Sequence, residues 1–201
     1  MKVTIIDYGA GNVPSVERAL ERLGGESERT NSSEKIARAE ALLLPGVGHY
    51  GALVRALDEQ KMREPLVGAL KRGVPFLGIC LGLQVLFESS AEAPELHGLN
   101  LMPGKVCALP STVKLPHMGW NQIASNGESR LLAGIDSSAY FYFAHSYAAP
   151  DSNDATSATC FYGSPFAAVL EKQNIYGVQF HPEKSGDSGS RLLENFLRIA
   201  A

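Results

Sequence analysis

Val74-Pro-Phe-Leu-Gly78-Ile-Cys80-Leu-Gly82-Leu-Gln84-Val-Leu-Phe-Glu88 is the stretch that decides both the fold and the chemistry of this chain. Its first half is an apolar run that predicts a buried strand, and the apolar spacing of residues 81–88 predicts a helix. Glycines two residues before and after Cys80 predict a sharp strand-to-helix turn, like the nucleophile elbow of G-x-S-x-G hydrolases. A thiol at a helix N-terminus meets unpaired N–H groups that favour the thiolate. The pattern therefore predicts a cysteine nucleophile at position 80.

Size and composition predict one ordinary globular domain. The chain has 201 residues, of which 45% are hydrophobic and 19% are charged, so it can bury a substantial core. The net charge is −3 and there is no basic run, which argues against nucleic acid as a partner. The first residues enter a strand pattern without the features of a signal peptide. No apolar stretch reaches the roughly 20 residues that span a bilayer, so we expect no membrane association.

The cysteines predict a reducing environment. Cys80, Cys107 and Cys160 are odd in number and far apart, so they suggest neither a disulfide framework nor a metal site. We expect a cytoplasmic protein that needs no metal and no cofactor. Cys107 and Cys160 are interpreted as inert packing residues.

Strand and helix patterns alternate through the first half of the chain. Strands are predicted at residues 3–7, 26–30, 41–44 and 74–79, and helices at 13–23, 32–38 and, as one or two helices, 49–71. The second half has strand patterns at 105–109, 121–125, 139–144, 157–161, 166–171 and 175–179, and a closing helix at 189–199. Alternating elements indicate a doubly wound α/β fold with a mostly parallel central sheet and flanking helices. An additional antiparallel strand region is predicted in the C-terminal half, and residues 1–201 are expected to form a single domain.

His181 is the histidine best placed to serve the thiol. It follows an apolar strand pattern and precedes Pro182, which favours an extended backbone. Residues two apart in an extended segment lie on the same side, so Glu183 can hold one ring nitrogen while the other faces Cys80. A solvated surface turn is the commoner meaning of such a sequence on its own, but the elbow favours a catalytic triad. The remaining histidines have no such companion in the sequence: His49, His97, His117 and His145.

Two glycine-containing turns are predicted near the same crevice. Pro45-Gly-Val-Gly48 follows a buried strand, and carboxyl ends of neighbouring strands converge in a doubly wound sheet. A glycine-flanked N–H of this loop and the N–H of Leu81 would stabilise an oxyanion. Gly9-Ala-Gly11-Asn12 lacks the third glycine of the dinucleotide fingerprint and the lysine of a P-loop, so we interpret it as a tight turn. Asn12 is a plausible N-cap of the helix that follows.

Together these motifs resemble the class I glutamine amidotransferases. The matching stretches are Gly78-Ile-Cys-Leu-Gly-Leu-Gln84, Pro45-Gly-Val-Gly48 and Val178-Gln-Phe-His-Pro-Glu-Lys-Ser185. Further stretches resemble one branch of that family, the glutaminase subunits of imidazole glycerol phosphate synthase. They are Ile6-Asp-Tyr-Gly-Ala-Gly-Asn12, His117-Met-Gly-Trp-Asn121, Tyr142-Phe-Ala-His-Ser-Tyr147 and Lys184-Ser185.

The resemblance implies a role for each matching residue. Cys80 would be the nucleophile, His181 the acid and base, and Glu183 its orienting partner. The oxyanion donors would be the amides of Val47 and Leu81. Glutamine's amino-acid end would be held by Gly48, Gln84, Glu92, Ser146 and Tyr147, and the partner would be faced by Asn12, Trp120, Asn121, Tyr142 and Lys184.

The implied reaction is hydrolysis of L-glutamine to glutamate and ammonia through a γ-glutamyl thioester. The implied partner is a (β/α)8-barrel cyclase, which forms a heterodimer with the glutaminase and uses the ammonia in histidine biosynthesis. Its products would be imidazole glycerol phosphate and aminoimidazole carboxamide ribotide. We expect low glutaminase activity from the isolated chain, because the loop at residues 46–48 could withdraw an oxyanion donor.

Two other functions remain open at this point. The chain could be the glutaminase subunit of another amidotransferase, serving pyridoxal phosphate, anthranilate or aminodeoxychorismate synthesis. Only the stretches around Trp120 and Tyr142 argue against it. A thiol sensor or chaperone on a similar fold would also have an elbow cysteine, but it would not need His181, Glu183 or an oxyanion loop.

Overall fold

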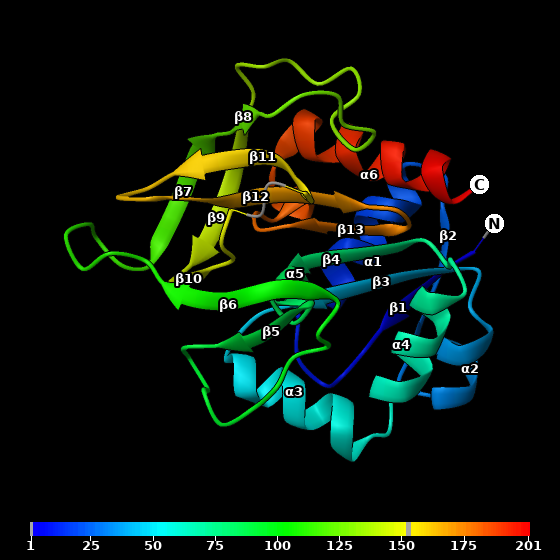
Figure 1. Ribbon diagram of the computed structural model, residues 1–201. Helices are drawn as coiled ribbons and strands as arrows, with labels where there is room; N and C mark the ends of the chain where they lie inside the picture. Colours follow the sequence, from blue (N-terminus) through cyan, green and yellow to red (C-terminus); the bar gives the residue numbers. More distant parts are fainter. Residues whose placement is uncertain (1, 152–153) are drawn as a thin grey trace.

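An eight-stranded sheet flanked by helices on both faces forms the centre of the molecule in the computed structural model, which describes residues 2–151 and 154–201 (Figure 1). The strand order is β2-β1-β3-β4-β13-β12-β11-β8. The first five strands of that order run parallel: β2 (Glu26–Thr30), β1 (Lys2–Ile6), β3 (Ala41–Gly46), β4 (Phe76–Cys80) and β13 (Ile175–Val178). The others are antiparallel: β12 (Pro165–Lys172), β11 (Thr156–Phe161) and β8 (Ala124–Ser125). The predicted mostly parallel sheet with an antiparallel C-terminal region is confirmed.

Different helices cover the two faces of the sheet. Successive side chains of β3 alternate between two buried clusters, so Leu42 and Leu44 lie in one and Leu43 in the other. The cluster of Leu43 is completed by α1 (Val13–Arg22) and α6 (Gly186–Ala200). The opposite cluster is completed by α2 (Ser33–Arg38), α3 (Tyr50–Glu59) and α4 (Arg63–Lys71). Burial on both faces explains why the central strands are apolar without interruption.

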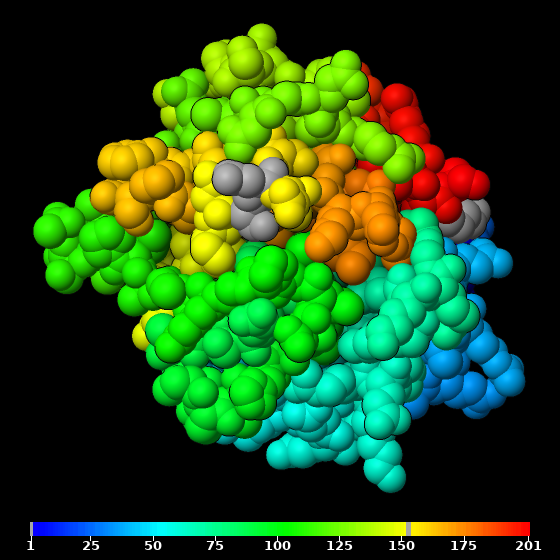
Figure 2. All heavy atoms as spheres, in the orientation of Figure 1, coloured from blue at the N-terminus to red at the C-terminus, as the bar shows by residue number. Residues whose placement is uncertain are grey.

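Two smaller sheets lie beside the carboxyl ends of the parallel strands. One has the order β10-β6-β5 and contains β5 (Phe87–Ser90), β6 (Met102–Ala108) and β10 (Tyr147–Ala148). The other pairs β7 (His117–Gln122) with β9 (Tyr140–His145) in antiparallel register. The segment between β6 and β7 projects from the body of the molecule (Figures 1 and 2). No helix in the described part of the chain is long and apolar enough to cross a membrane.

Two sequence predictions of elements were wrong. The helix after Cys80, α5, ends at Gln84 instead of reaching residue 88, because Phe87 begins a strand that pairs with Met102. The apolar residues 85–87 are all fully buried, so their spacing reflects enclosure on every side and not one helical face. The strand predicted at 121–125 is divided between the end of β7 and the short β8, which belong to different sheets. The hairpin predicted across residues 171–174 is confirmed by the pairing of Lys172 with Ile175.

Candidate active site

The turn between β4 and α5 (Leu81–Gln84) holds the cysteine in an unusual backbone conformation. Cys80 has φ 54° and ψ −106°, a combination that ordinary side chains rarely adopt, and its residue is 4% exposed. The glycines around it serve a different purpose from the one predicted. A Cβ on Gly82 would lie 1.9 Å from the carbonyl oxygen of Leu44, and one on Gly78 would lie 2.3 Å from that of Gly82. The glycines therefore allow close packing of the turn, while the cysteine itself adopts the positive φ.

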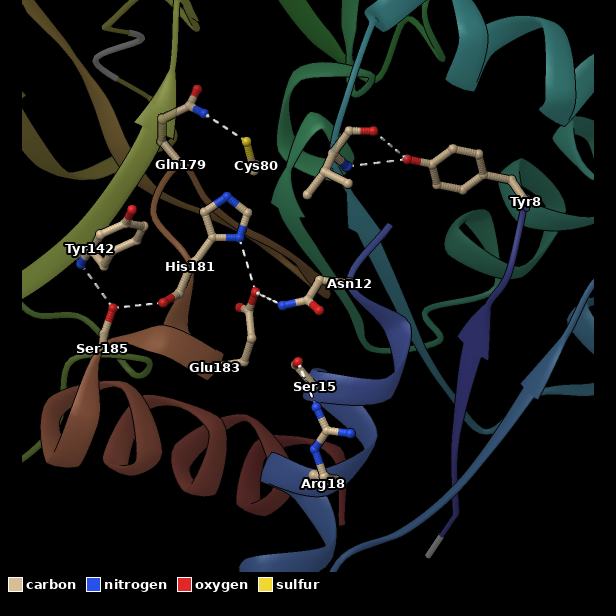
Figure 3. A network of polar contacts seen from close by, with 11 residues as sticks. Tyr8, Asn12, Ser15, Arg18, Cys80, Tyr142, Gln179, His181, Glu183 and Ser185 are labelled. Atoms are coloured by element: carbon tan, nitrogen blue, oxygen red, sulfur yellow. Dashed lines mark hydrogen bonds and ion pairs between the residues drawn. The ribbon is translucent and has the colours of Figure 1, made fainter. Parts of the chain in front are cut away.

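Cys80, His181 and Glu183 lie next to one another at the carboxyl edge of the parallel strands, with the imidazole between the other two (Figure 3). His181 Nδ1 is 3.0 Å from Glu183 Oε1, and these side chains are only 2% and 1% exposed. The Cys80 sulfur lies on the other side of the imidazole and helps to raise its pKa (Figure 3). Because Nδ1 is directed at the carboxylate, the nitrogen at the sulfur is Nε2. Residues about a hundred positions apart in the chain are thus brought into one row.

The charges of this row favour a protonated His181 beside an ionised Glu183. Burial by itself lowers the pKa of His181, but hydrogen bonds and charge interactions with Cys80 and Glu183 outweigh it and raise the pKa to about 10. Burial raises the pKa of Glu183, but the His181 hydrogen bond and charge, with smaller help from Asn12, leave it below its ordinary value. The imidazole therefore carries a proton at neutral pH that it can donate to a leaving group.

Glu183 reaches His181 from a helical turn and not from the extended segment that was predicted. Pro182–Lys184 form the 3-10 helix η1, and only His181 before it is extended, with φ −102° and ψ 96°. Asn12 Nδ2 donates to Glu183 Oε1 over 3.2 Å. Asn12 does occupy the N-cap position of α1, but its side chain makes no capping hydrogen bond there. The amide of Asn12 is used to hold the carboxylate instead.

A cavity of about 250 Å³ opens directly onto Cys80 and His181. The Glu92 carboxylate at its wall accepts the N–H of Tyr50 over 2.7 Å. The buried Oε1 of Gln84, another residue of the lining, has no hydrogen-bond partner among the described residues. The lining includes every residue predicted to stabilise the oxyanion or hold the substrate: Val47, Gly48, Leu81, Gln84, Glu92, Ser146 and Tyr147. Sequence reasoning missed other lining residues, Pro116, Ala144 and His145.

The N–H of Val47 is engaged by Tyr8, contrary to its predicted role as an oxyanion donor in this conformation. It donates to the Tyr8 hydroxyl over 3.2 Å, and that hydroxyl donates to the Val47 carbonyl over 3.2 Å. Burial raises the pKa of Tyr8 to about 12, so the phenol stays neutral and can both give and accept a hydrogen bond. Tyr8 follows β1 and Val47 follows β3, and the sequence contains no local signal that joins them.

His117 and His145 have no carboxylate companion such as Glu183 in the sequence, but the fold places each beside the other. They face one another on β7 and β9, with His117 Nδ1 3.0 Å from His145 Nε2. His145 Nδ1 donates to the Tyr147 carbonyl over 2.9 Å, which fixes its tautomer. Burial lowers the pKa of His117 to about 4 and that of His145 to about 3. Both rings are therefore neutral beside the cavity.

An exposed aromatic surface lies on the outer side of the same sheet. The ring of Trp120, which is 55% exposed, meets the ring of Tyr142 edge-on at 6.0 Å, and Lys184 Nζ lies 5.7 Å from the Tyr142 ring. Asn121, which was also predicted to face the partner, is instead hydrogen-bonded within the chain. Its side-chain amide donates to the Phe161 carbonyl. The Tyr142 carbonyl accepts the N–H of His181 over 2.8 Å. The backbone of the half-buried Tyr142 therefore holds the backbone of His181 directly.

Comparison with known proteins identifies the family. The family model of class I glutamine amidotransferases matches residues 4–200. The chain belongs to the class I glutamine amidotransferases. Among the described residues, no group of three or more His, Cys, Asp or Glu side chains is placed to hold a metal ion.

Relatives place the chain in one branch of these amidotransferases. It is 47% identical over 197 residues to "Imidazole glycerol phosphate synthase subunit HisH" of Methanothermobacter thermautotrophicus, covering 98% of each chain. A protein of the same name from Salinibacter ruber is 43% identical over 205 residues, covering 98% of this chain and 94% of the relative. The chain is a member of this HisH branch. The structure of PurLQS from Thermotoga maritima superimposes with a TM-score of 0.79 at 19% identity, over 100% of this chain and 99% of that one, and shows the shared amidotransferase fold.

Proposed function

We propose that this chain hydrolyses the side-chain amide of L-glutamine, with Cys80 as nucleophile, His181 as acid and base, and Glu183 as the residue that orients His181. The observation that carries the proposal is the buried row of these three side chains at the wall of a small polar cavity. The cavity already brings the sulfur and the imidazole together at one amino-acid-sized space.

The reaction follows from the positions of the protons. The Cys80 thiolate attacks the amide carbon of glutamine, and the carbonyl electrons move to the oxygen. His181 gives its Nε2 proton to the departing nitrogen, so ammonia leaves and a γ-glutamyl thioester remains. The now neutral imidazole takes a proton from water, and the resulting hydroxide attacks the thioester. Glutamate is released and the sulfur returns as the thiolate beside the imidazolium.

The oxyanion site is the incomplete part of this arrangement. Leu81 is the first residue of α5, where a helical N–H has no partner within the helix and is free for an anion. Val47 can become the second donor only after its N–H leaves the Tyr8 hydroxyl. We therefore expect slow hydrolysis by the isolated chain and faster hydrolysis when a partner and its ligand favour the rearranged loop.

Ammonia chemistry favours a partner that receives the product out of contact with water. In bulk water at neutral pH, ammonia is protonated and loses its nucleophilicity. We propose that the partner is the (β/α)8-barrel cyclase of imidazole glycerol phosphate synthase, in the cytoplasm, as the names of the relatives suggest. It would bind the aromatic surface of Trp120, Tyr142 and Lys184, where exposed Met118 adds apolar area.

Reconstitution tests the proposal. The chain is mixed with a histidine-pathway cyclase, and glutamate release is measured with and without the cyclase ligand, together with formation of imidazole glycerol phosphate. We expect ligand-stimulated hydrolysis that disappears in Cys80→Ser and His181→Ala. Retention of turnover in either variant would exclude the triad. Stimulation by the ammonia-accepting subunit of another pathway, with none from the histidine-pathway cyclase, would exclude the proposed partner.

A further inference from the structure

We propose that Gln179 is an additional catalytic residue of the glutaminase, because its side-chain amide donates a hydrogen bond to the Cys80 sulfur and stabilises the thiolate. The inference rests on the proposed function. Gln179 is completely buried, and its Nε2 lies 3.6 Å from Cys80 Sγ (Figure 3). That distance is appropriate for an N–H donor to the large sulfur atom.

The backbone aims Gln179 and His181 at the same sulfur. Gln179 continues the strand pairing of β13, since its N–H donates to the Ala168 carbonyl over 2.9 Å. The chain bends at Gln179 and Phe180, just after the end of β13. Phe180, between the two, lies in the core instead, where its ring stacks on that of Phe141 at 4.2 Å. The side chains on either side of Phe180 therefore both lie at the sulfur, one an amide and the other an imidazole.

A backbone carbonyl determines which end of the Gln179 amide faces the sulfur. The Tyr147 carbonyl can only accept, so the group of Gln84 that lies 2.8 Å from it must be the amide nitrogen Nε2. The same nitrogen lies 3.0 Å from the side-chain oxygen of Gln179, which uses the second of its two hydrogens. With its oxygen satisfied in this way, Gln179 presents its NH₂ group to Cys80. The reverse orientation would place NH₂ against NH₂ and oxygen against sulfur.

The hydrogen-bond chain is well anchored and adds no competing charge. His145 Nδ1 donates to the same Tyr147 carbonyl over 2.9 Å, and the low pKa of His145 keeps that ring neutral. The chain of amides therefore provides the sulfur with a fixed dipole. A hydrogen bond to an ionised group shifts its protonation by about one to two pH units, so loss of Gln179 should be measurable.

The test measures the ionisation of the sulfur without requiring turnover. The full-length chain is treated with iodoacetamide across a range of pH, and the alkylation rate of the Cys80 peptide is followed by mass spectrometry, since Cys107 and Cys160 are also free thiols. The variant Gln179→Met keeps the length of the side chain and removes the donor. The control is Gln173→Met, the same change at an exposed position in the turn between β12 and β13.

We expect the alkylation midpoint to rise by about one to two pH units in Gln179→Met and to stay unchanged in Gln173→Met. If Gln179→Met does not fold, Gln179→Leu decides, because leucine also removes the donor and adds no charge beside the sulfur. Other titratable groups at the sulfur and the cavity are retained in every variant: Tyr8, Glu92, His145, His181 and Lys184.

An unshifted midpoint in a folded Gln179 variant would overturn this inference. That result is distinguishable from failure of the proposed function. A shifted midpoint in a chain that never hydrolyses glutamine with any partner would leave the sulfur contact intact and refute the glutaminase. Normal hydrolysis with an unshifted midpoint would leave the glutaminase function intact and refute the role of Gln179.

Discussion

The backbone of Cys80 should make glycine an unusually good replacement for the nucleophile. At φ 54° and ψ −106°, a residue with a Cβ bears strain of about 1–3 kcal/mol, from which glycine is exempt. The informative comparison is between Cys80→Gly and Cys80→Ala, since both lack the thiol and differ only by one methyl group. Neither variant turns over substrate, so the measurement concerns folding alone.

The expected magnitude comes from opposing terms. Replacing an ordinary buried alanine by glycine loses about 0.8 kcal/mol of apolar burial and about 0.5–1 kcal/mol through the entropy of the unfolded chain. That loss of about 1.5 kcal/mol is expected at Ala168, which is fully buried in β12 without a positive φ. At position 80 the relieved strain offsets it. We therefore expect Cys80→Gly to be at least as stable as Cys80→Ala.

Denaturant unfolding and thermal melts of the two variants, the parent chain and Ala168→Gly provide the test. For a chain of this size, 1 kcal/mol corresponds to about 2–4 °C in Tm, so the control should melt several degrees below its parent. The pair at position 80 should melt together, or with the glycine variant higher. If Cys80→Gly falls below Cys80→Ala by as much as Ala168→Gly falls below the parent, the backbone of the elbow is not strained and the reasoning fails.

Three further outcomes are expected. Glu183→Gln removes the carboxylate that is proposed to orient the His181 imidazole. In the assembled complex, kcat should therefore fall by about 10²–10⁴-fold with little change in KM. An unchanged kcat would contradict the proposed triad. The pKa values of His117 and His145, lowered to about 4 and 3, mean that the unfolded chain binds protons below about pH 6.5 while the folded chain does not. Unfolding free energy should therefore drop as pH falls from about 6.5 towards 4, and His117→Gln should reduce that slope in urea titrations by about one proton. Tyr8→Phe releases the N–H of Val47, so glutamate release by the isolated chain should increase; a decrease would mean that the hydroxyl supports the active loop.

Local sequence signals were sufficient for the fold class and for the row formed by Cys80, His181 and Glu183. Alternating strand and helix patterns predicted the doubly wound sheet, because each pattern depends on residues a few positions apart. The glycines around Cys80 and the proline after His181 likewise restrict their immediate backbone. The geometry then followed from a general property of parallel sheets, whose strand ends meet at one edge.

Contacts between distant segments could not be predicted in the same way. Tyr8 and Val47 are 39 positions apart, and Gln84 and Gln179 are 95 apart, so no spacing rule connects them. The length of α5 was overestimated for a related reason. A fully enclosed segment has no polar face, so its periodicity cannot distinguish a helix from a turn followed by a strand. The role of Asn12 was also decided by a remote group, the Glu183 carboxylate.

The backbone of Tyr142 connects the outer aromatic surface to His181. Its half-buried ring meets Trp120 on that surface, while its carbonyl accepts the His181 N–H and its own N–H donates to Ser185 Oγ over 3.0 Å. Ser185 Oγ in turn donates to the His181 carbonyl over 2.6 Å. A small molecule bound to Trp120 and Tyr142 from outside would shift the peptide group of Tyr142 and, with it, His181. An inhibitor of the enzyme therefore need not resemble glutamine. A molecule bound at this outer surface would stop the reaction while the substrate is still bound.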